Sequence, residues 1–380
     1  MNLNPKTNLI SESLTLKLNS LANKLKAEGK DIVNLTAGEL DFPTPIFVQK
    51  EIKAKVGLNK YTPTGGTTSL RNAIARQVYK DYKWKITSSN VAVTAGGKQA
   101  LFESMFTILK KGDEVIVPSP DWVTYRYQII LNDATPVIVP LDKKFDLDVE
   151  KIKKAISKKT KAIILNSPNN PTGSIYSQAS LLKLKKILKN KKIYLIVDDI
   201  YSKIVYDKTY KSPVFFASDK KYLILINSFS KSQALTGWRI GYVVANEKII
   251  EAINSYQSHT TGNASLLSQI AAEKIIEKGD KTDGFVKILR ARKDLVNNLL
   301  STIPRISYEI PKGAFYYFID VSKIETNTIK FCEDLLDSGL VLVPGDAFGR
   351  KGFVRLSFSA EKSKIVKGIK IFKEFCEKYK

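Results

Sequence analysis

Short apolar runs separated by amphipathic stretches dominate the middle of this chain. The runs are VAVT, EVIVPSP, Thr135–Pro140, Ala162–Leu165, IYLIV, Tyr222–Ile226 and Ile240–Ala245. A strand that is covered by helices on both faces is apolar at nearly every position, because both of its faces lie in the core. The pattern from about Val91 to Ala245 therefore predicts an α/β fold, with a mostly parallel central sheet wrapped by helices.

Helical spacing of apolar residues is found between these runs and toward both ends of the chain. Leucines at 14, 18, 21 and 25 predict a helix over Ser11–Gly29, with the glycine as its C-terminal stop. Further helices are expected at Ser69–Tyr82, Ser180–Lys189, Ser268–Glu277 and Gly284–Leu300. We expect residues 46–279 to form a large domain. We assign residues 13–45 and 280–380 to a smaller, discontinuous α/β domain, and residues 1–12 to an N-terminal arm.

The composition is that of an ordinary globular protein. The chain has 380 residues, of which 43% are hydrophobic and 26% are charged. No apolar run approaches the roughly 20 residues that span a bilayer, and the N-terminus lacks the apolar segment of a signal peptide. The two cysteines, Cys332 and Cys376, are too few for a disulfide framework, so we expect reduced thiols and a cytoplasmic location.

Histidine content and charge narrow the chemistry. The single histidine, His259, rules out a His-rich zinc site, although one histidine would suffice for a Ser-His-Asp triad. The formal net charge of +24 raises nucleic acid as a partner. However, the lysines interleave with leucines at helical spacing, as on a solvated helix face, and no nucleic-acid-binding motif is visible. We expect neither a metal site, nor nucleic acid, nor a membrane as a partner.

Lys231 lies in the stretch SFSKSQALTGWRIGY, at residues 228–242, between two predicted strands. Apolar surroundings lower the pKa of a lysine and make its amine a nucleophile. The hydroxyls of Ser228 and Ser230 and the guanidinium of Arg239 would suit a phosphate. The alternative is a surface lysine between strands. A lysine beside a phosphate site is what a pyridoxal-phosphate Schiff base requires.

This stretch resembles the cofactor-lysine signature of the aspartate aminotransferase family, the fold-type I pyridoxal-phosphate enzymes. The family pattern is Ser-x-Ser-Lys followed by Gly-x-Arg-x-Gly, and every fixed position is present. The resemblance extends from about Leu35 to Ser359, with further motifs in the family's order. They are TAGELDFPTP, NKYTPTGG, the Gly-Gly-Lys turn in Val91–Phe102, NSPNNPTG, DDIY and the arginine strand GFVRLSFS.

The resemblance implies a role for each cofactor-binding residue. Lys231 would hold pyridoxal 5'-phosphate as a Schiff base and act as the catalytic base and acid. Asp198 would pair with the pyridinium nitrogen, while Asn170 and Tyr201 would contact the phenolic oxygen. Trp122 would stack on the ring. From the residues alone, Trp122 would more often be a core aromatic, and Asp198-Asp199 could also hold Mg²⁺.

The resemblance also implies a phosphate site and a shared active site. Gly97 and Lys98 would donate backbone amides at a helix N-terminus, where an anion is stabilised. A tight turn between a strand and a helix would also favour the two glycines, Gly96 and Gly97, at this point. Ser228, Ser230 and Arg239 would complete the phosphate site. Tyr61, otherwise a surface aromatic, would reach the cofactor of a neighbouring subunit, which implies a homodimer.

Four residues concern the substrate, in addition to Asn170. Arg355 lies in a strand among apolar neighbours, so its side chain needs an anion, either a structural salt bridge or the substrate α-carboxylate that the family binds here. By the resemblance, Gly38 would lie in a loop that covers the substrate, and Trp122 would form part of the same pocket. Lys98 would hold a distal carboxylate of the substrate. Departures from the family pattern occur at three positions. Leu40 stands where proline is usual, Asp199 where glutamate is usual, and Gly262 where serine is usual.

The resemblance implies an aminotransferase that uses two half-reactions in a ping-pong mechanism. A bacterial subgroup of aspartate aminotransferases also carries lysine where this sequence has Lys98, so the resemblance favours aspartate as the amino donor, with 2-oxoglutarate as acceptor. Broad-specificity aromatic, alanine or prephenate aminotransferases share the other motifs. A carbon–sulfur lyase of the same fold and a pyridoxal-phosphate-sensing regulator are further alternatives, although such regulators carry an added DNA-binding domain for which this sequence shows no segment.

Overall fold

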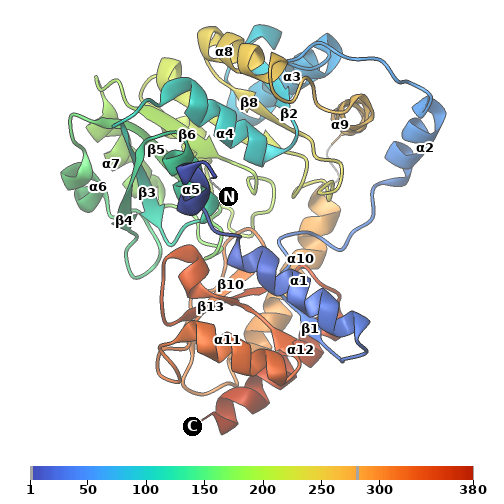
Figure 1. Cartoon of the computed structure of the whole chain (residues 1–380), viewed down its shortest axis with the longest axis vertical. Helices are drawn as coiled ribbons and strands as arrows, with labels where there is room; N and C mark the ends of the chain where they lie inside the picture. The colour runs from blue at the N-terminus through green and yellow to red at the C-terminus, as the bar shows by residue number, and fades with distance from the viewer. Residues whose placement is uncertain (1–2, 280–281, 380) are drawn as a thin grey trace.

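The computed structural model describes residues 3–279 and 282–379, which form two layered units (Figure 1). The larger unit contains a seven-stranded sheet in the order β2-β8-β7-β6-β5-β3-β4. Its strands are β2 (Val91–Thr94), β3 (Glu114–Ser119), β4 (Thr135–Pro140), β5 (Thr160–Asn166), β6 (Tyr194–Asp198), β7 (Leu223–Ser228) and β8 (Gly241–Val244). Only β8 breaks the parallel arrangement, running antiparallel to β2 and β7. The predicted α/β fold is confirmed.

Apart from the edge strand β4, both faces of this sheet are buried, and successive strand residues enter different cores. In β5, Ile163 and Leu165 belong to one apolar core, whereas Ala162 and Ile164 belong to another. The first core also contains residues of α2 (Ile46–Lys55), α3 (Thr68–Tyr82), α6 (Val149–Ala155), α7 (Gln178–Leu188) and α9 (Leu266–Lys278). The second contains α4 (Gly97–Ile108), α5 (Thr124–Leu131) and α8 (Glu247–Ser258). Two-sided burial explains why these strands are apolar throughout.

The smaller unit surrounds a four-stranded antiparallel sheet in the order β12-β13-β10-β9. Its strands are β9 (Ser307–Tyr308), β10 (Tyr316–Asp320), β12 (Val343–Pro344) and β13 (Phe353–Ser357). The helices are α1 (Leu14–Ala27), α10 (Thr282–Leu300), α11 (Thr328–Asp337) and α12 (Lys362–Lys378). A short parallel pair, β1 (Val33–Asn34) with β11 (Leu340–Val341), links the two ends of the chain.

The N-terminal segment shares the core of this smaller unit. Val33 and Leu35 pack in one cluster with residues of α10, α11 and α12, and Leu18 of α1 packs with Leu336 and Val341. This packing favours the predicted discontinuous small domain, which remains a prediction. Its proposed boundary at residue 280 lies outside the described residues. The described part of the N-terminal arm lies against α5 (Figure 1).

Element boundaries agree with the sequence-based expectations to within a few residues. In the segment Pro311–Asp320, the strand β10 begins only at Tyr316. Gly313, at its start, is instead packed against another segment, and a Cβ there would come within 2.4 Å of Pro168 Cγ. Cys332 and Cys376 lie buried as free thiols in α11 and α12. Within residues 3–279 and 282–379, no helix is long and apolar enough to cross a bilayer.

Candidate active site

Several strands of the large sheet end at a cavity of about 500 Å³. Asn166 ends β5 and Asp198 ends β6, and both line this cavity together with residues of the smaller unit. Open α/β sheets place ligands at the carboxyl ends of their strands. Most of the predicted site residues meet here. They are Gly38, Gly97, Lys98, Trp122, Asn170, Asp198, Tyr201, Ser230, Lys231, Arg239 and Arg355.

Lys231 follows the end of β7 and faces the cavity. Its ammonium group donates a hydrogen bond to the carbonyl oxygen of Gly38. Burial lowers the pKa of Lys231 to about 8; Glu39 opposes this shift, while Arg355 and Arg239 add to it. A lysine with such a pKa is partly unprotonated near neutral pH, so its amine can act as a nucleophile and as a base.

Asp198 offers a carboxylate inside the same cavity. It is only 6% exposed, and burial raises its pKa, while hydrogen bonds and the charge of Lys231 oppose the rise. The hydroxyl of Tyr125 donates to Asp198 Oδ2 at 2.7 Å, and the side-chain amide of Asn166 donates to the backbone oxygen of Asp198 at 3.0 Å. The carboxylate is therefore fixed in place, and among residues 3–279 and 282–379 it forms no ion pair. This arrangement suits a protonated ring nitrogen.

Arg355 lies in β13 and is only 2% exposed. One guanidinium nitrogen donates to Asn170 Oδ1 at 2.8 Å and another to the backbone oxygen of Thr36 at 2.7 Å. The guanidinium lies between the rings of Tyr316 and Phe348, at 4.4 and 4.8 Å from their centroids. Among the described residues it forms no ion pair with a carboxylate, and its Nε has no partner. An arginine held in this way is prepared for an external carboxylate.

Three glycines explain how an anion site forms beside Lys231. A Cβ on Gly241 would lie 2.7 Å from the backbone carbon of Gly96, so strand β8 can pass the loop before α4 only without a side chain. A Cβ on Gly96 would lie 2.6 Å from Arg239 Nη2. Gly97 begins the helix α4, whose first backbone amides have no partner within the helix. Arg239 and a helix N-terminus thus meet at one wall, as a phosphate requires.

Trp122 and Lys98 form another wall of the cavity. The ammonium group of Lys98 lies 5.3 Å from the ring centroid of Trp122. Burial lowers the pKa of Lys98, and the positive charge of Arg239 lowers it further. The tryptophan ring is held edge-on against Tyr125, with centroids 5.5 Å apart. The wall therefore presents a flat aromatic surface and a cation together.

Two predicted site residues lie away from the cavity surface. Tyr61 is 98% exposed and does not line the cavity. Ser228 is buried, and its hydroxyl accepts a hydrogen bond from the backbone amide of Ser230 at 3.2 Å. Within this chain, Ser228 therefore supports the turn that carries Lys231. Its predicted phosphate contact and that of Tyr61 remain predictions.

The structure adds site residues that the sequence did not reveal. Tyr125 supports Asp198, and Tyr316 shares a hydrogen bond of 3.0 Å with the hydroxyl of Tyr201 and packs on Arg355. Tyr125 follows Trp122 by about one helical turn, and this spacing was the only indication in the sequence that Tyr125 lies near the site. The sequence could not show that its partner, Asp198, lies at the end of strand β6. Within the described residues, no group of three or more His, Cys, Asp or Glu side chains is placed to hold a metal ion.

These residues fit pyridoxal phosphate. The cavity combines a lysine of lowered pKa, a buried carboxylate without a cation and a glycine-lined anion site. Lys231 would hold the cofactor, Asp198 its ring nitrogen, and Asn170 and Tyr201 its phenolic oxygen. The phosphate would bind at the N-terminus of α4.

Comparison with known sequences and structures agrees with this reading. Residues 30–369 match the sequence model of the family described as aminotransferase class I and II. The chain is 39% identical, over 97% of each sequence, to a probable aspartate/prephenate aminotransferase of Aquifex aeolicus. It superposes on the crystal structure of an aspartate aminotransferase from Thermotoga maritima with a TM-score of 0.94, at 37% identity and covering 99% and 100% of the two chains.

A second solved structure carries information on a ligand. It is the aspartate aminotransferase of Thermus thermophilus with maleate, a four-carbon dicarboxylate. The TM-score is 0.94 at 34% identity, with 98% of this chain and 99% of that chain covered. The likeness extends over both layered units.

Proposed function

This chain belongs to the class I and II aminotransferase family, and from that premise we propose that it transfers the amino group of L-aspartate to 2-oxoglutarate. It is a pyridoxal-phosphate-dependent aminotransferase. The choice of aspartate rests on one observation in particular. Besides Lys231 and Arg239, which are assigned to the cofactor, the cavity contains the guanidinium of Arg355 and the ammonium of Lys98, and neither of these two is neutralised by an ion pair within the described residues.

The chain's own groups would divide the work as follows. When bound, pyridoxal phosphate supplies a ring that accepts the electrons left when the amino acid loses its Cα proton. Lys231 would take that proton as a base and return it as an acid, for which a pKa of about 8 is well placed. Asp198 would keep a proton at the ring nitrogen. Trp122 would stack on the ring and fix its orientation, and Arg355 would orient the substrate through its α-carboxylate.

A dicarboxylic substrate would use both cations. Arg355 would bind the carboxylate that every amino acid carries, whereas Lys98 would bind a carboxylate that only aspartate and glutamate carry. The relatives support this assignment, because their names include aspartate, and one was studied with a dicarboxylate. The name of the Aquifex relative also includes prephenate, which makes prephenate the first alternative acceptor to test.

We also propose a homodimer with shared active sites. Tyr61 is almost fully exposed, in a segment that contributes nothing to the cavity of its own chain. A single exposed aromatic is common on protein surfaces, so the support comes from its Tyr-Thr-Pro motif, whose tyrosine in the family reaches the cofactor of a neighbouring subunit. The cytoplasmic location stays a prediction from the sequence.

Replacement of the two cations tests the substrate assignment. Arg355→Lys loses the planar two-bond fork and should lower kcat/KM for aspartate, phenylalanine and alanine together, by about ten- to a hundredfold. Lys98→Met should lower kcat/KM for aspartate and glutamate by about tenfold or more and leave alanine and phenylalanine nearly unchanged. Steady-state kinetics measure both effects, with 2-oxoglutarate as acceptor for aspartate, alanine and phenylalanine and with oxaloacetate as acceptor for glutamate.

Lys110→Met serves as a matched control, because Lys110 lies just after α4 and does not line the cavity. A uniform loss for all donors in Lys98→Met would mean that Lys98 shapes the phosphate site and binds no substrate carboxylate. The aspartate assignment would then be wrong, although the aminotransferase activity would stand.

A further inference from the structure

A second cavity, of about 520 Å³, lies away from the active site. It is formed by the C-terminal end of α3, one side of α7 from Gln178 to Lys185 and the segment 202–216 after β6. None of its described lining residues also lines the active-site cavity. The two cavities are similar in volume, so each has room for a molecule the size of an amino acid.

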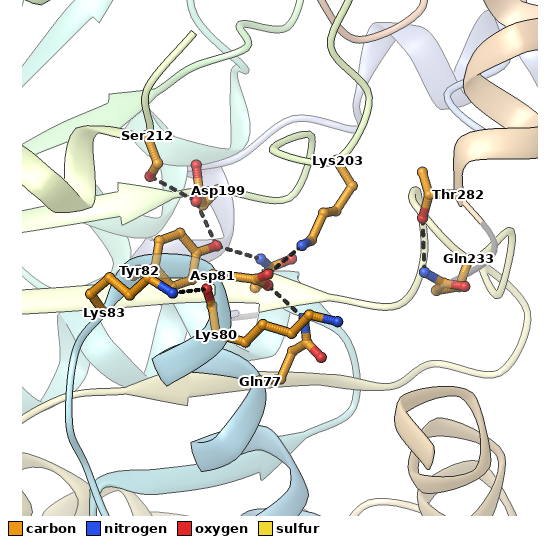
Figure 2. A network of polar contacts seen from close by, with 11 residues as sticks. Gln77, Lys80, Asp81, Tyr82, Lys83, Asp199, Lys203, Ser212, Gln233 and Thr282 are labelled. Atoms are coloured by element: carbon orange, nitrogen blue, oxygen red, sulfur yellow. Dashed lines mark hydrogen bonds and ion pairs between the residues drawn. The ribbon is translucent and has the colours of Figure 1, made fainter. Parts of the chain in front are cut away.

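Positive charge is in excess around this second cavity. Lys185, Lys203 and Lys211 line it, whereas Asp81 is the sole carboxylate among its described lining residues. Asp81 pairs with Lys203 at 2.6 Å and accepts a second hydrogen bond, of 2.9 Å, from Gln77 (Figure 2). Lys185 and Lys211 form no ion pair within the described part of the chain. The cavity therefore carries cations that an anion would neutralise.

The same cavity exposes apolar surface. Leu182 is 49% exposed and Phe215 is 42% exposed, and both line the cavity. The rings of Tyr82 and Phe216 add buried aromatic surface to the wall. A simple inorganic anion would leave this surface in contact with water. A ligand that combines a negative charge with an apolar body would cover it.

The floor of the cavity is fixed by hydrogen bonds directed away from it. The hydroxyls of Tyr82 and Ser212 each donate to the buried carboxylate of Asp199 at 2.8 Å (Figure 2). The hydroxyl of Tyr210 lies within hydrogen-bond distance of the same carboxylate, at 3.1 Å, and of the backbone oxygen of Ser167, at 2.8 Å. These hydroxyls are therefore already used. The lysine side chains supply charge at the rim, and the aromatic rings supply the apolar floor.

We propose that this cavity binds a small organic anion with an aromatic or branched apolar body, at a site separate from the active site. The carboxylate would lie between Lys185 and Lys211, with Lys203 able to add a donor because an ammonium group carries more than one N–H. The apolar body would cover Leu182 and Phe215. The inference does not depend on which amino donor the enzyme uses.

Calorimetric titration of the holoenzyme with 3-phenylpropionate tests the proposal. This probe also resembles an amino-acid substrate, so it can bind at Arg355. The titration is therefore repeated in Arg355→Lys, where we expect binding at the second cavity to persist unchanged. Adding Lys185→Met and Lys211→Met to that protein should weaken the remaining binding by about five- to tenfold, as expected for partly exposed ion pairs. Propionate, which lacks the ring, should bind far more weakly.

Lys183→Met with Lys208→Met provides the matched control. Lys183 lies in α7 and Lys208 in the same loop as Lys211, and both are exposed and outside the cavity. The control should bind the probe as the Arg355→Lys protein does. Both lysine pairs are replaced in the Arg355→Lys protein. The proposal is overturned if Arg355→Lys abolishes all binding, if the Lys185/Lys211 variant and the Lys183/Lys208 control bind equally in that protein, or if propionate matches 3-phenylpropionate. Thermal unfolding of each variant checks that it is folded.

Discussion

At the scale of single residues, burial has shifted the pKa of the two groups that would handle protons. It lowers the pKa of Lys231 to about 8 and raises that of Asp198. Both shifts have the same cause, because a low-dielectric site disfavours whichever form is charged. Lys231 thereby becomes a usable base. Asp198 gains most from a positively charged neighbour, which restores its ionised form.

Attachment of the cofactor should therefore depend on pH in a way that reports on Lys231. In the apoenzyme, only the unprotonated amine can react, so the rate of attachment should rise with pH and level off above about pH 8. An unshifted lysine would keep accelerating until about pH 10. Stopped-flow absorbance after mixing with pyridoxal phosphate measures the rate. Borohydride reduction followed by peptide mass spectrometry should find the cofactor on Lys231, and an adduct on another lysine would contradict the assignment.

Asp198→Asn should separate cofactor binding from catalysis. The amide has the same shape and can still accept a hydrogen bond from Tyr125, but it carries no charge to stabilise a protonated ring nitrogen. We expect the variant to keep its cofactor and to lose about a hundredfold or more in kcat. Bound cofactor is measured by absorbance and kcat under saturating substrate. Near-normal turnover would show that Asp198 has another role.

At the scale of elements, Asp199 connects parts of the large unit. It follows β6 directly and is fully buried, and hydroxyls from α3 and from the segment 210–212 donate to it. Its pKa is raised to about 6, mainly by burial. The aspartate found where the family usually has glutamate is thus well satisfied by hydrogen bonds. It also holds the backbone next to Asp198.

This carboxyl should give the protein a measurable pH dependence of stability. In the unfolded chain its pKa is about 3.9, so between about pH 4 and pH 6 the folded state binds more protons than the unfolded state. Stability contributed by Asp199 therefore falls as the pH rises through this window and is constant above about pH 7. Urea unfolding of wild type and Asp199→Asn should show the wild-type advantage shrinking by about 1 kcal/mol from pH 5 to pH 7.5. An advantage that grows with pH would mean that the pKa is lowered instead.

Much of the fold and site could be predicted from the sequence because the determinants are local. The all-apolar strands, the glycines beside Lys231 and the polar residues at strand ends each occupy a few consecutive positions. Contacts between distant segments could not be predicted in this way. Tyr125 reaches Asp198 and Tyr82 reaches Asp199 across the folded unit, and neither tyrosine differs from a core aromatic in its own surroundings. The antiparallel direction of β8 also depends on its pairing with β2 and β7, which no local sequence pattern indicates.

At the scale of the whole molecule, one loop joins both units over the active site. Gly38 accepts a hydrogen bond from Lys231, and Thr44 accepts one from the indole of Trp238 at 2.9 Å. From the other side, Arg292 of α10 forms two bonds of 2.8 Å to Asp41. The covering loop is thus tied to the catalytic lysine and to the smaller unit together. A shift of that unit would be transmitted to Lys231 by this loop.

The remaining question at this scale is whether one chain forms a complete site. The described cavity lacks any contribution from Tyr61, which is 98% exposed. If Tyr61 completes the site of a partner, Tyr61→Ala impairs the partner's site and Lys231→Ala impairs its own. A heterodimer of the two variants then contains one site with both defects and one site with neither. Mixing them should restore about a quarter of wild-type activity per site, since half of the dimers are mixed and each has one intact site.

This complementation distinguishes a shared site from a merely dimeric protein. If Tyr61 acted within its own chain, every site in the mixed dimer would carry one defect, and activity would stay at the level of the separate variants. Subunit exchange must be verified, for which differently tagged chains and co-purification suffice. Phe215→Ala mixed with Lys231→Ala is the control, because Phe215 is another exposed aromatic that lies outside the active-site cavity. Phe215→Ala should be active by itself, so its mixture should show only its own share of activity. A Tyr61 mixture that exchanges subunits without gaining activity would place Tyr61 outside the partner's site, and the proposed sharing would be wrong.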